Sequence, residues 1–198
     1  IYIKHIYNLI YNIMISQEGS HATYNAVPLK VTGHRTFFHN VHCRNIGASA
    51  ITNASHRSLV IGAAYDVSFS GCTFGETSYD SGTTASYVME VDAADGGKFL
   101  FRDCTFLGAG SINASFLKYP AQGGGFTYFK DCLFYNRCTG AFEAMAQFGN
   151  IGGGTDPIIL KGCEIIGVTA MQTASTNAFY GENALAAGTT QRGVVLTG

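Results

Sequence analysis

The stretch Phe99-Leu-Phe101-Arg-Asp103-Cys104-Thr-Phe106 decides the fold of this chain, because close copies of it recur along the sequence. Each copy reads apolar, any residue, apolar, polar, Gly or Asp, Cys, any residue, apolar. The other full copies lie at 67–74, 127–134 and 158–165. Looser or partial copies lie at 10–15, 38–43 and 194–198. The chain therefore contains an internal repeat, which has to be interpreted before any other feature.

The spacing of the repeat identifies the kind of architecture. The Cys position, or the residue that replaces it, falls at 13, 41, 72, 104, 132 and 163, in steps of 28, 31, 32, 28 and 31 residues. A period near 30 residues is typical of solenoids, in which each repeat contacts only its neighbours. Chain segments about 30 residues apart are therefore expected to lie directly over one another.

The apolar spacing within each copy predicts a bent strand. Apolar residues two apart indicate a strand with one buried face. The spacing then changes from two to three across the residue before the Cys position, so we expect the strand to turn a corner there. Every residue at that corner is Asn, Asp or Gly, which tolerate a left-handed backbone best. These residues are Asn12, Asn40, Gly71, Asp103, Asp131, Gly162 and Gly198.

The repeated unit is a strand, a left-handed corner and a second strand. This repeat predicts an all-β parallel β-helix of about six to seven rungs, with residues 1–198 as a single domain. Like residues would stack at about 4.8 Å along three inward columns. The first column is Ile10, Phe38, Phe69, Phe101, Phe129, Leu160 and Leu196. The second is Ile13, Val41, Cys72, Cys104, Cys132 and Cys163. The third is Ile15, Cys43, Phe74, Phe106, Phe134 and Ile165.

Composition agrees with this fold and limits the function. The chain is 46% hydrophobic and only 13% charged, with a net charge of −1, so a nucleic-acid binder is not expected. No apolar run approaches the ~20 residues of a membrane span. The sequence starts inside a repeat and stops one residue before the next Cys position. We expect it to be a portion of a longer chain, or to have its ends covered by neighbouring chains.

The six cysteines are predicted to be mostly packing residues. Four of them occupy equivalent inward positions, where Cys behaves as a small apolar side chain. We therefore predict free stacked thiols, with disulfides and a metal site as the alternatives left open. Cys138 is the one cysteine expected near solvent. Reduced thiols would fit a protein assembled in a cytoplasm.

All six histidines precede residue 57. His39 and His42 flank Val41 and are expected to point outward. A transition-metal site there is the alternative to solvated or partner-facing histidines, but no grouping of His and Cys supports it. We therefore assign no metal-binding residues and no cofactor.

Carboxylates are the groups on which an enzymatic reading depends. Asp103 and Asp131 occupy equivalent corners, and paired acids of this kind cleave glycosidic bonds in some β-helices. Gly71 and Gly162 fill the same position, so we interpret it as a requirement for backbone geometry. The neighbouring outward column would neutralise the two acids; it consists of Ser70, Arg102, Lys130 and Lys161.

Other acids form no constellation that a lyase or hydrolase would need. Glu90 and Asp92 flank Val91, and Glu143 lies farther along the chain. A calcium-dependent lyase would require several acids converging with an Arg or Lys base. We do not find that convergence in the sequence and assign no catalytic residues.

The runs Phe69-Ser-Gly-Cys-Thr-Phe-Gly75, Phe101-Arg-Asp-Cys-Thr-Phe106 and Phe129-Lys-Asp-Cys-Leu-Phe-Tyr135 resemble the rungs of right-handed parallel β-helices of the pectate-lyase-like superfamily. The Cys-rich, weakly charged version is similar to β-helix proteins that tailed bacteriophages encode as virion components. The resemblance covers nearly the whole chain. It implies a right-handed, single-stranded helix with three short sheets, often assembled as trimers on capsids or tails. No catalytic residue carries over, because none of the superfamily's acid constellations can be matched.

Three functions remain open at this point, since fold alone does not assign function. The first is a non-enzymatic virion structural protein, such as a capsid decoration, vertex or fibre component, whose partners are other virion proteins and further copies of itself. The second is a glycan-cleaving tailspike or lyase. The third is a glycan-binding module, which predicts a row of exposed aromatic residues drawn from Tyr79, Tyr87, Tyr119 and Tyr128.

Overall fold

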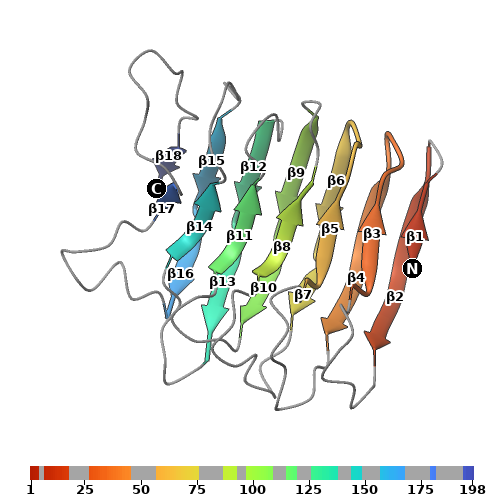
Figure 1. Cartoon of the computed structure of the whole chain (residues 1–198), viewed down its shortest axis with the longest axis horizontal. Coiled ribbons are helices and arrows are strands. Elements are labelled where there is room, and N and C mark those ends of the chain that lie inside the picture. Colours follow the sequence, from red (N-terminus) through yellow and green to blue (C-terminus); the bar gives the residue numbers. More distant parts are fainter. Residues whose placement is uncertain are drawn as a thin grey trace.

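The computed structural model confirms an all-β chain. It describes residues 1–4, 7–17, 27–45, 57–75, 87–92, 97–108, 115–119, 126–137, 144–148, 157–167, 179–181 and 194–198. These residues contain eighteen β-strands and no helix. All strand pairings are parallel, and segments about 30 residues apart in the chain lie side by side (Figure 1). The molecule is therefore a parallel β-solenoid, as the repeat predicted.

One sheet, which we call sheet A, takes a single short strand from each turn of the chain. Its seven strands lie in sequence order along the solenoid. They are β1 (Tyr2–Ile3), β3 (Leu29–Val31), β5 (Leu59–Ile61), β8 (Tyr87–Val91), β11 (Ser115–Tyr119), β14 (Ala144–Phe148) and β17 (Phe179–Gly181). The register of β14 on β11 places Ala146 beside Leu117.

The other sheet, sheet B, contains eleven strands and bends around the core. Its first limb is made of the strands before each corner, β6 (Val67–Ser70), β9 (Lys98–Arg102), β12 (Phe126–Lys130), β15 (Ile158–Lys161) and β18 (Val194–Thr197). Its second limb is made of the strands after each corner, β7 (Thr73–Gly75), β10 (Thr105–Gly108), β13 (Leu133–Asn136) and β16 (Glu164–Ile166). The long strands β2 (Leu9–Gln17) and β4 (Phe37–Asn45) run through the corner.

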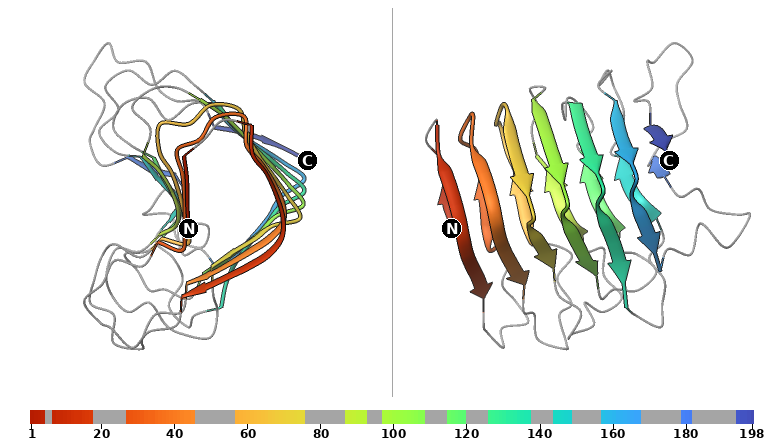
Figure 2. Two further views of the ribbon diagram at one scale, coloured as in Figure 1. Left: turned by 90° about the vertical axis from the view of Figure 1, so that its right-hand side faces the viewer. Right: turned by 180° about the vertical axis from the view of Figure 1, so that it is seen from behind.

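The two limbs belong to one sheet because β4 pairs with both of them. Its first half pairs with β6 and its second half with β7. The implied three short sheets are therefore present as three faces, two of which are joined through β4. Viewed along the solenoid, sheet A and the bent sheet B enclose the core (Figure 2).

The corners have the predicted left-handed backbone. The φ angle is positive at Asn12, Asn40, Asp103 and Asp131, between 53° and 55°, and it is 62° at Gly71 and 60° at Gly162. The backbone N–H groups of Asp103 and Asp131 donate to the carbonyls of Lys130 and Lys161 on the next turn. Each corner is thus bonded to the turn above it, which keeps the columns aligned.

Two rows of phenyl rings run through the core, which also contains buried aliphatic and cysteine side chains. In the first row Phe38, Phe69, Phe101 and Phe129 stack face to face, with centroids 4.6, 4.7 and 4.8 Å apart. The second row contains Phe74, Phe106 and Phe134, and its rings meet those of the first row edge to face, as in the Phe69–Phe74 pair at 87°. Both arrangements are favourable for aromatic pairs. The strand register confirms that the residues of the first and third predicted columns lie over one another. Leu196 of the first column was also expected to be inward, but at the last described turn it is 63% exposed.

Candidate functional site

The predicted cysteine column lies inside the solenoid. Cys72, Cys104 and Cys132 are no more than 2% exposed. The thiols of Cys104 and Cys132 donate to the carbonyls two residues earlier, at 3.2 and 3.3 Å. All cysteines within the described residues are free, so the prediction of unbridged thiols is confirmed for Cys43, Cys72, Cys104, Cys132 and Cys163. Cys138 lies outside the described residues.

The environment of two of these thiols favours the protonated form. Burial raises the pKa of the Cys43 thiol from 9.0 to about 12, and the neighbouring Cys72 adds to the increase. Hydrogen bonds with Cys132 and Cys72, together with burial, raise the pKa of Cys104 well above its ordinary value. A thiol needs to become a thiolate to act as a nucleophile or metal ligand. Cys43 and Cys104 are buried in the core, where their side chains pack.

The corner acids Asp103 and Asp131 lie on the surface of the solenoid. Both Asp103 and Asp131 are exposed, and the Lys130 ammonium lies 3.6 Å from an Asp131 carboxylate oxygen. The other Asp131 carboxylate oxygen lies over Gly162, where an added Cβ would be only 2.5 Å away. The expected neutralisation by the adjacent basic column is therefore present at Asp131.

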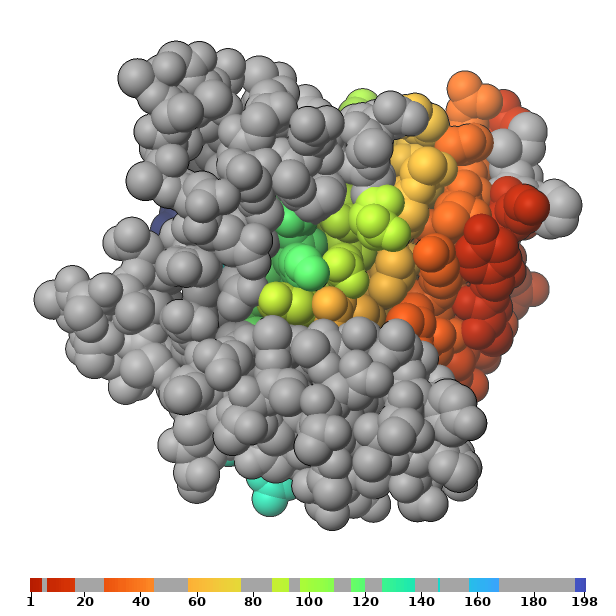
Figure 3. Space-filling view, in the orientation of Figure 1, coloured from red at the N-terminus to blue at the C-terminus, as the bar shows by residue number. Residues whose placement is uncertain are grey.

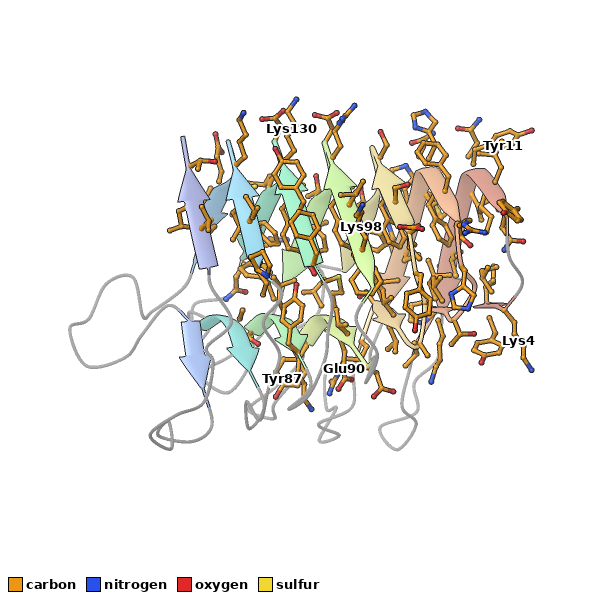
Figure 4. All side chains as sticks on the ribbon, turned by 90° about the horizontal axis from the view of Figure 1, so that it is seen from above. Lys4, Tyr11, Tyr87, Glu90, Lys98 and Lys130 are labelled. Carbon is orange, nitrogen blue, oxygen red and sulfur yellow. The ribbon has the colours of Figure 1, made fainter. Side chains whose placement is uncertain are left out.

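An ion-pair cluster on the outer face of sheet A was not predicted from the sequence. The Arg57 guanidinium donates to one Glu90 carboxylate oxygen at 2.6 Å, and the Lys118 ammonium lies 3.3 Å from the other. Both cations also lie over the Tyr87 ring, at 4.2 and 5.0 Å from its centroid. Figure 4 shows Tyr87 and Glu90 on this side of the ribbon, and Figure 3 shows β5, β8 and β11 side by side on the same face.

This cluster spans three consecutive turns of the solenoid. Lys118 is the register partner of Glu90, and Arg57 precedes β5. The Arg57 side chain is only 7% exposed, so its charge requires a partner. Both Glu90 oxygens are engaged with cations, which gives the carboxylate a structural role. The 28-residue step between Glu90 and Lys118 was the available signal, since it equals a step of the repeat.

The proposed row of aromatic residues for glycan binding is wrong for two of its members. Tyr119 is fully buried, because it lies two residues after Leu117 and shares its inward face. Tyr87 is buried beneath the two cations. Tyr128 is half-buried and points outward on β12, while Tyr79 lies outside the described residues.

The histidines within the described residues form no metal site. His39 is exposed and His42 half-buried, as expected for outward positions. The His42 ring nitrogen Nε2 is 3.0 Å from the side-chain oxygen Oδ1 of Asn40, and the Asn40 side-chain NH₂ group donates to Oδ1 of Asn12 at 2.8 Å. No group of three or more His, Cys, Asp or Glu side chains in the described part of the chain is arranged to hold a metal ion. His5, His21, His56 and Glu143 lie outside that part.

The outer face of the first limb of sheet B has the most distinctive surface. Strand register aligns six apolar side chains, interrupted by Ser68, into a line that we call the apolar row: Leu9, Phe37, Leu100, Tyr128, Ile159 and Val195. Leu9 is 64% exposed, Val195 43%, Phe37 39% and Leu100 37%. Tyr128 and Ile159 are half-buried. On the inner strands β4, β9, β12 and β15 the next residue along each strand is buried, namely Phe38, Phe101, Phe129 and Leu160.

Three cations follow one another beside the apolar row. This basic row consists of Arg102, Lys130 and Lys161, which are register partners on β9, β12 and β15. Lys98 begins β9 on the same outward side, and the Phe126 and Tyr128 rings lie 6.5 Å apart on β12. Figure 4 shows Lys130 on the side of the ribbon opposite Tyr87 and Glu90. This face combines apolar area with positive charge and is the candidate functional site.

Comparison with known proteins gives no assignment: no family model, no curated protein and no solved structure matches the chain. None of the described residues belongs to a helix that is long and apolar enough to cross a membrane.

Proposed function

We propose that this chain is a non-enzymatic structural protein of a larger assembly, namely a virion component of a tailed bacteriophage such as a capsid decoration, vertex or fibre protein. The observation that carries the proposal is the apolar row. Contiguous exposed apolar surface on a folded protein usually marks an interaction site. The row runs along the first limb of sheet B with one interruption at Ser68, so it suits contact with another elongated subunit better than enclosure of a small ligand.

Two further features support an assembly role. The phenyl and thiol columns repeat on successive turns, so the outer faces are held on a rigid scaffold. The phage setting rests on the resemblance of the Cys-containing rungs to those of virion β-helices. Assembly in the host cytoplasm would agree with the free thiols.

The proposal is tested on purified phage particles. Quantitative mass spectrometry of gradient-purified particles should find peptides of this chain at a fixed ratio to the major capsid protein. The matched control is the soluble fraction of the same lysate after removal of particles. Finding the chain only in that soluble fraction would contradict a virion role.

Glycan binding is the second candidate, and one observation favours it. Phe126 and Tyr128 point outward beside Lys130, and aromatic rings next to a cation can hold a sugar ring and an acidic group. A glycan array probed with the purified chain should then give signals that Tyr128→Ala removes and Tyr135→Ala does not. Incubation with host capsule or lipopolysaccharide, followed by analysis of released oligosaccharides, tests the glycan-cleaving alternative.

A further inference from the structure

We infer that the column of free thiols formed by Cys72, Cys104, Cys132 and Cys163 is a binding site for soft monovalent metal ions, with Cu(I) as the cellular ion that suits it. Each ion would lie between the sulfurs of two successive turns and bind both of them in line. This site goes beyond the proposed structural function and does not depend on it.

The four cysteines lie directly over one another. The residue after each of the later three cysteines donates its backbone N–H to the cysteine carbonyl of the preceding turn: Thr105 to Cys72, Leu133 to Cys104 and Glu164 to Cys132, at 2.8, 2.9 and 3.0 Å. Equivalent residues of successive turns are therefore about 4.8 Å apart, which is the spacing of neighbouring strands. The turns superpose when the solenoid is viewed along its axis (Figure 2).

The four sulfurs also point the same way. Each thiol donates to the carbonyl two residues earlier, at 3.4 Å for Cys72, 3.2 Å for Cys104, 3.3 Å for Cys132 and 3.6 Å for Cys163. Because the four side chains share this hydrogen bond, they share one orientation, and their sulfurs form a line parallel to the solenoid axis. Sulfur–sulfur hydrogen bonds connect Cys132 with both of its neighbours in the line, Cys104 and Cys163.

The spacing of this line suits a metal ion that is bound by two sulfurs. A zinc–thiolate bond is about 2.3 Å long, and a Cu(I)–thiolate bond is of similar length. Two such bonds in line span roughly 4.6 Å, which is close to the distance between turns. No third ligand among the described residues converges on the column. Zinc requires four ligands in a tetrahedron, whereas Cu(I) is stable between two thiolates, so the column selects Cu(I).

Packing alone does not require sulfur at these positions. The same column begins with Ile13 and Val41, which are register partners, and Val41 is fully buried. An aliphatic side chain therefore fills the position, yet the next four turns all carry cysteine. Cys72, Cys104 and Cys132 are at most 2% exposed. Their burial excludes water and the hard ions that need oxygen ligands.

Binding exchanges thiol protons for metal ions. Each Cu(I) displaces one proton and forms two copper–sulfur bonds, and no electron is transferred. Four sulfurs enclose three intervals, so three ions would displace three protons and leave the charge of the core unchanged. This balance matters because an uncompensated charge in the core would be costly. Since the sulfurs are buried, we expect the ions to enter while the turns fold together.

Refolding in the presence of copper tests the inference. The chain carrying Cys138→Ser, in which only the cysteines of the described residues remain, is refolded without oxygen, with or without Cu(I) supplied as its acetonitrile complex, and is then desalted. Metal analysis should find about three copper ions per chain, one for each interval between the four sulfurs. X-ray absorption spectroscopy should show two sulfur neighbours per copper and no nitrogen or oxygen neighbour.

Two double variants with the same number of cysteines separate adjacency from thiol content. Cys104→Val/Cys132→Val leaves no two sulfurs of the column on successive turns and should bind no copper. The matched control is Cys43→Val/Cys163→Val, because Cys43 lies in the third column. This control keeps Cys72, Cys104 and Cys132 on successive turns, so it should bind two ions.

Equal copper in the two double variants would overturn the inference, as would copper bound through nitrogen or oxygen, or refolded chain that holds no copper. Each variant is first checked for the far-ultraviolet circular dichroism of the wild type. If Cys104→Val/Cys132→Val does not fold, the single variants replace it. Cys104→Ala leaves one adjacent pair and should bind one ion, against three for Cys43→Ala, and equal binding by these two variants would likewise overturn the inference.

Discussion

The two sides of strand β9 show how differently one repeat can be used. Phe101 is buried between Phe69 and Phe129, with ring centroids 4.7 and 4.8 Å away. Its neighbour Leu100 points the other way and is 37% exposed. Both positions repeat at the same register on the next turn, yet the inner one carries phenylalanine on four consecutive turns and the outer one changes from Phe37 to Ser68, Leu100 and Tyr128. The inside of the solenoid is specified by packing, and its outside is available for function.

The largest expected difference in stability between the two sides of β9 comes from truncating the adjacent residues Phe101 and Leu100. Phe101→Ala should lower the free energy of unfolding by about 3–5 kcal/mol, because it leaves a cavity between two stacked rings. Leu100→Ala should cost less than about 1 kcal/mol, since the side chain is already partly in water. Urea denaturation at low protein concentration measures both values. Equal losses would mean that the two sides of the strand contribute alike, against the structure.

The corner offers a test in which the backbone matters more than the side chain. Asp103 has a φ of 53°, which costs a β-branched residue roughly 1–2 kcal/mol. Asp103→Val should therefore destabilise by about that amount, while Asp103→Gly should lie within about 0.5 kcal/mol of wild type. Thr105→Val, two residues later and outside the left-handed region, is the control. If Asp103→Gly were as unstable as Asp103→Val, the Asp103 carboxylate, and not the left-handed backbone, would be the reason for an Asp at this corner.

Inside the solenoid, the pH dependence of stability should report the buried Cys43 thiol. Below about pH 9 the thiol is protonated in the folded and unfolded states, so its contribution does not change with pH. Between about pH 9 and 12 only the unfolded chain loses the proton, so stability falls as pH rises. The loss at pH 10 is about 1.4 kcal/mol. Denaturation of wild type and Cys43→Val across pH 7–10 measures it, and identical slopes would contradict the assignment.

The smallest effect is expected for the ion pair at the outer corner. The Lys130 and Asp131 side chains are 38% and 50% exposed, and pairs of this kind contribute little to stability. Lys130→Ala should change the free energy of unfolding by less than about 0.5 kcal/mol. A loss of several kcal/mol would show that the basic row stabilises the fold itself, which would weaken its assignment to binding.

Prediction from the sequence was most successful at positions where the residue type permits only one backbone conformation or one side-chain direction. Left-handed corners at Asn12, Asn40, Asp103 and Asp131, and the stacking of Phe101 on Phe129, were predicted because backbone sterics and alternation allow little else. The ion-pair cluster of Arg57, Glu90 and Lys118 was missed because Arg57 lies before its strand, where the repeat gives no register. The burial of Tyr87 follows from that cluster and was missed with it.

The joining of the two limbs of sheet B could not be predicted from the sequence either. The same Asn, Asp or Gly corner interrupts the strand at Asp103 but not at Asn40, where β4 continues from Phe37 to Asn45. The apolar row was present in the sequence as alternate residues of each strand. Its exposure became visible only when the register showed that no other described element covers it.

The parallel ladders have a mechanical consequence. Hydrogen bonds between successive turns, such as those from Asp103 to Lys130 and from Asp131 to Lys161, run along the long axis of the molecule. A pull along that axis would load one turn at a time and peel the terminal rung first, with small, evenly spaced force steps. A pull along the strands would instead shear many bonds together. The molecule should therefore withstand a much larger force when it is pulled parallel to its strands than when it is pulled along the solenoid axis.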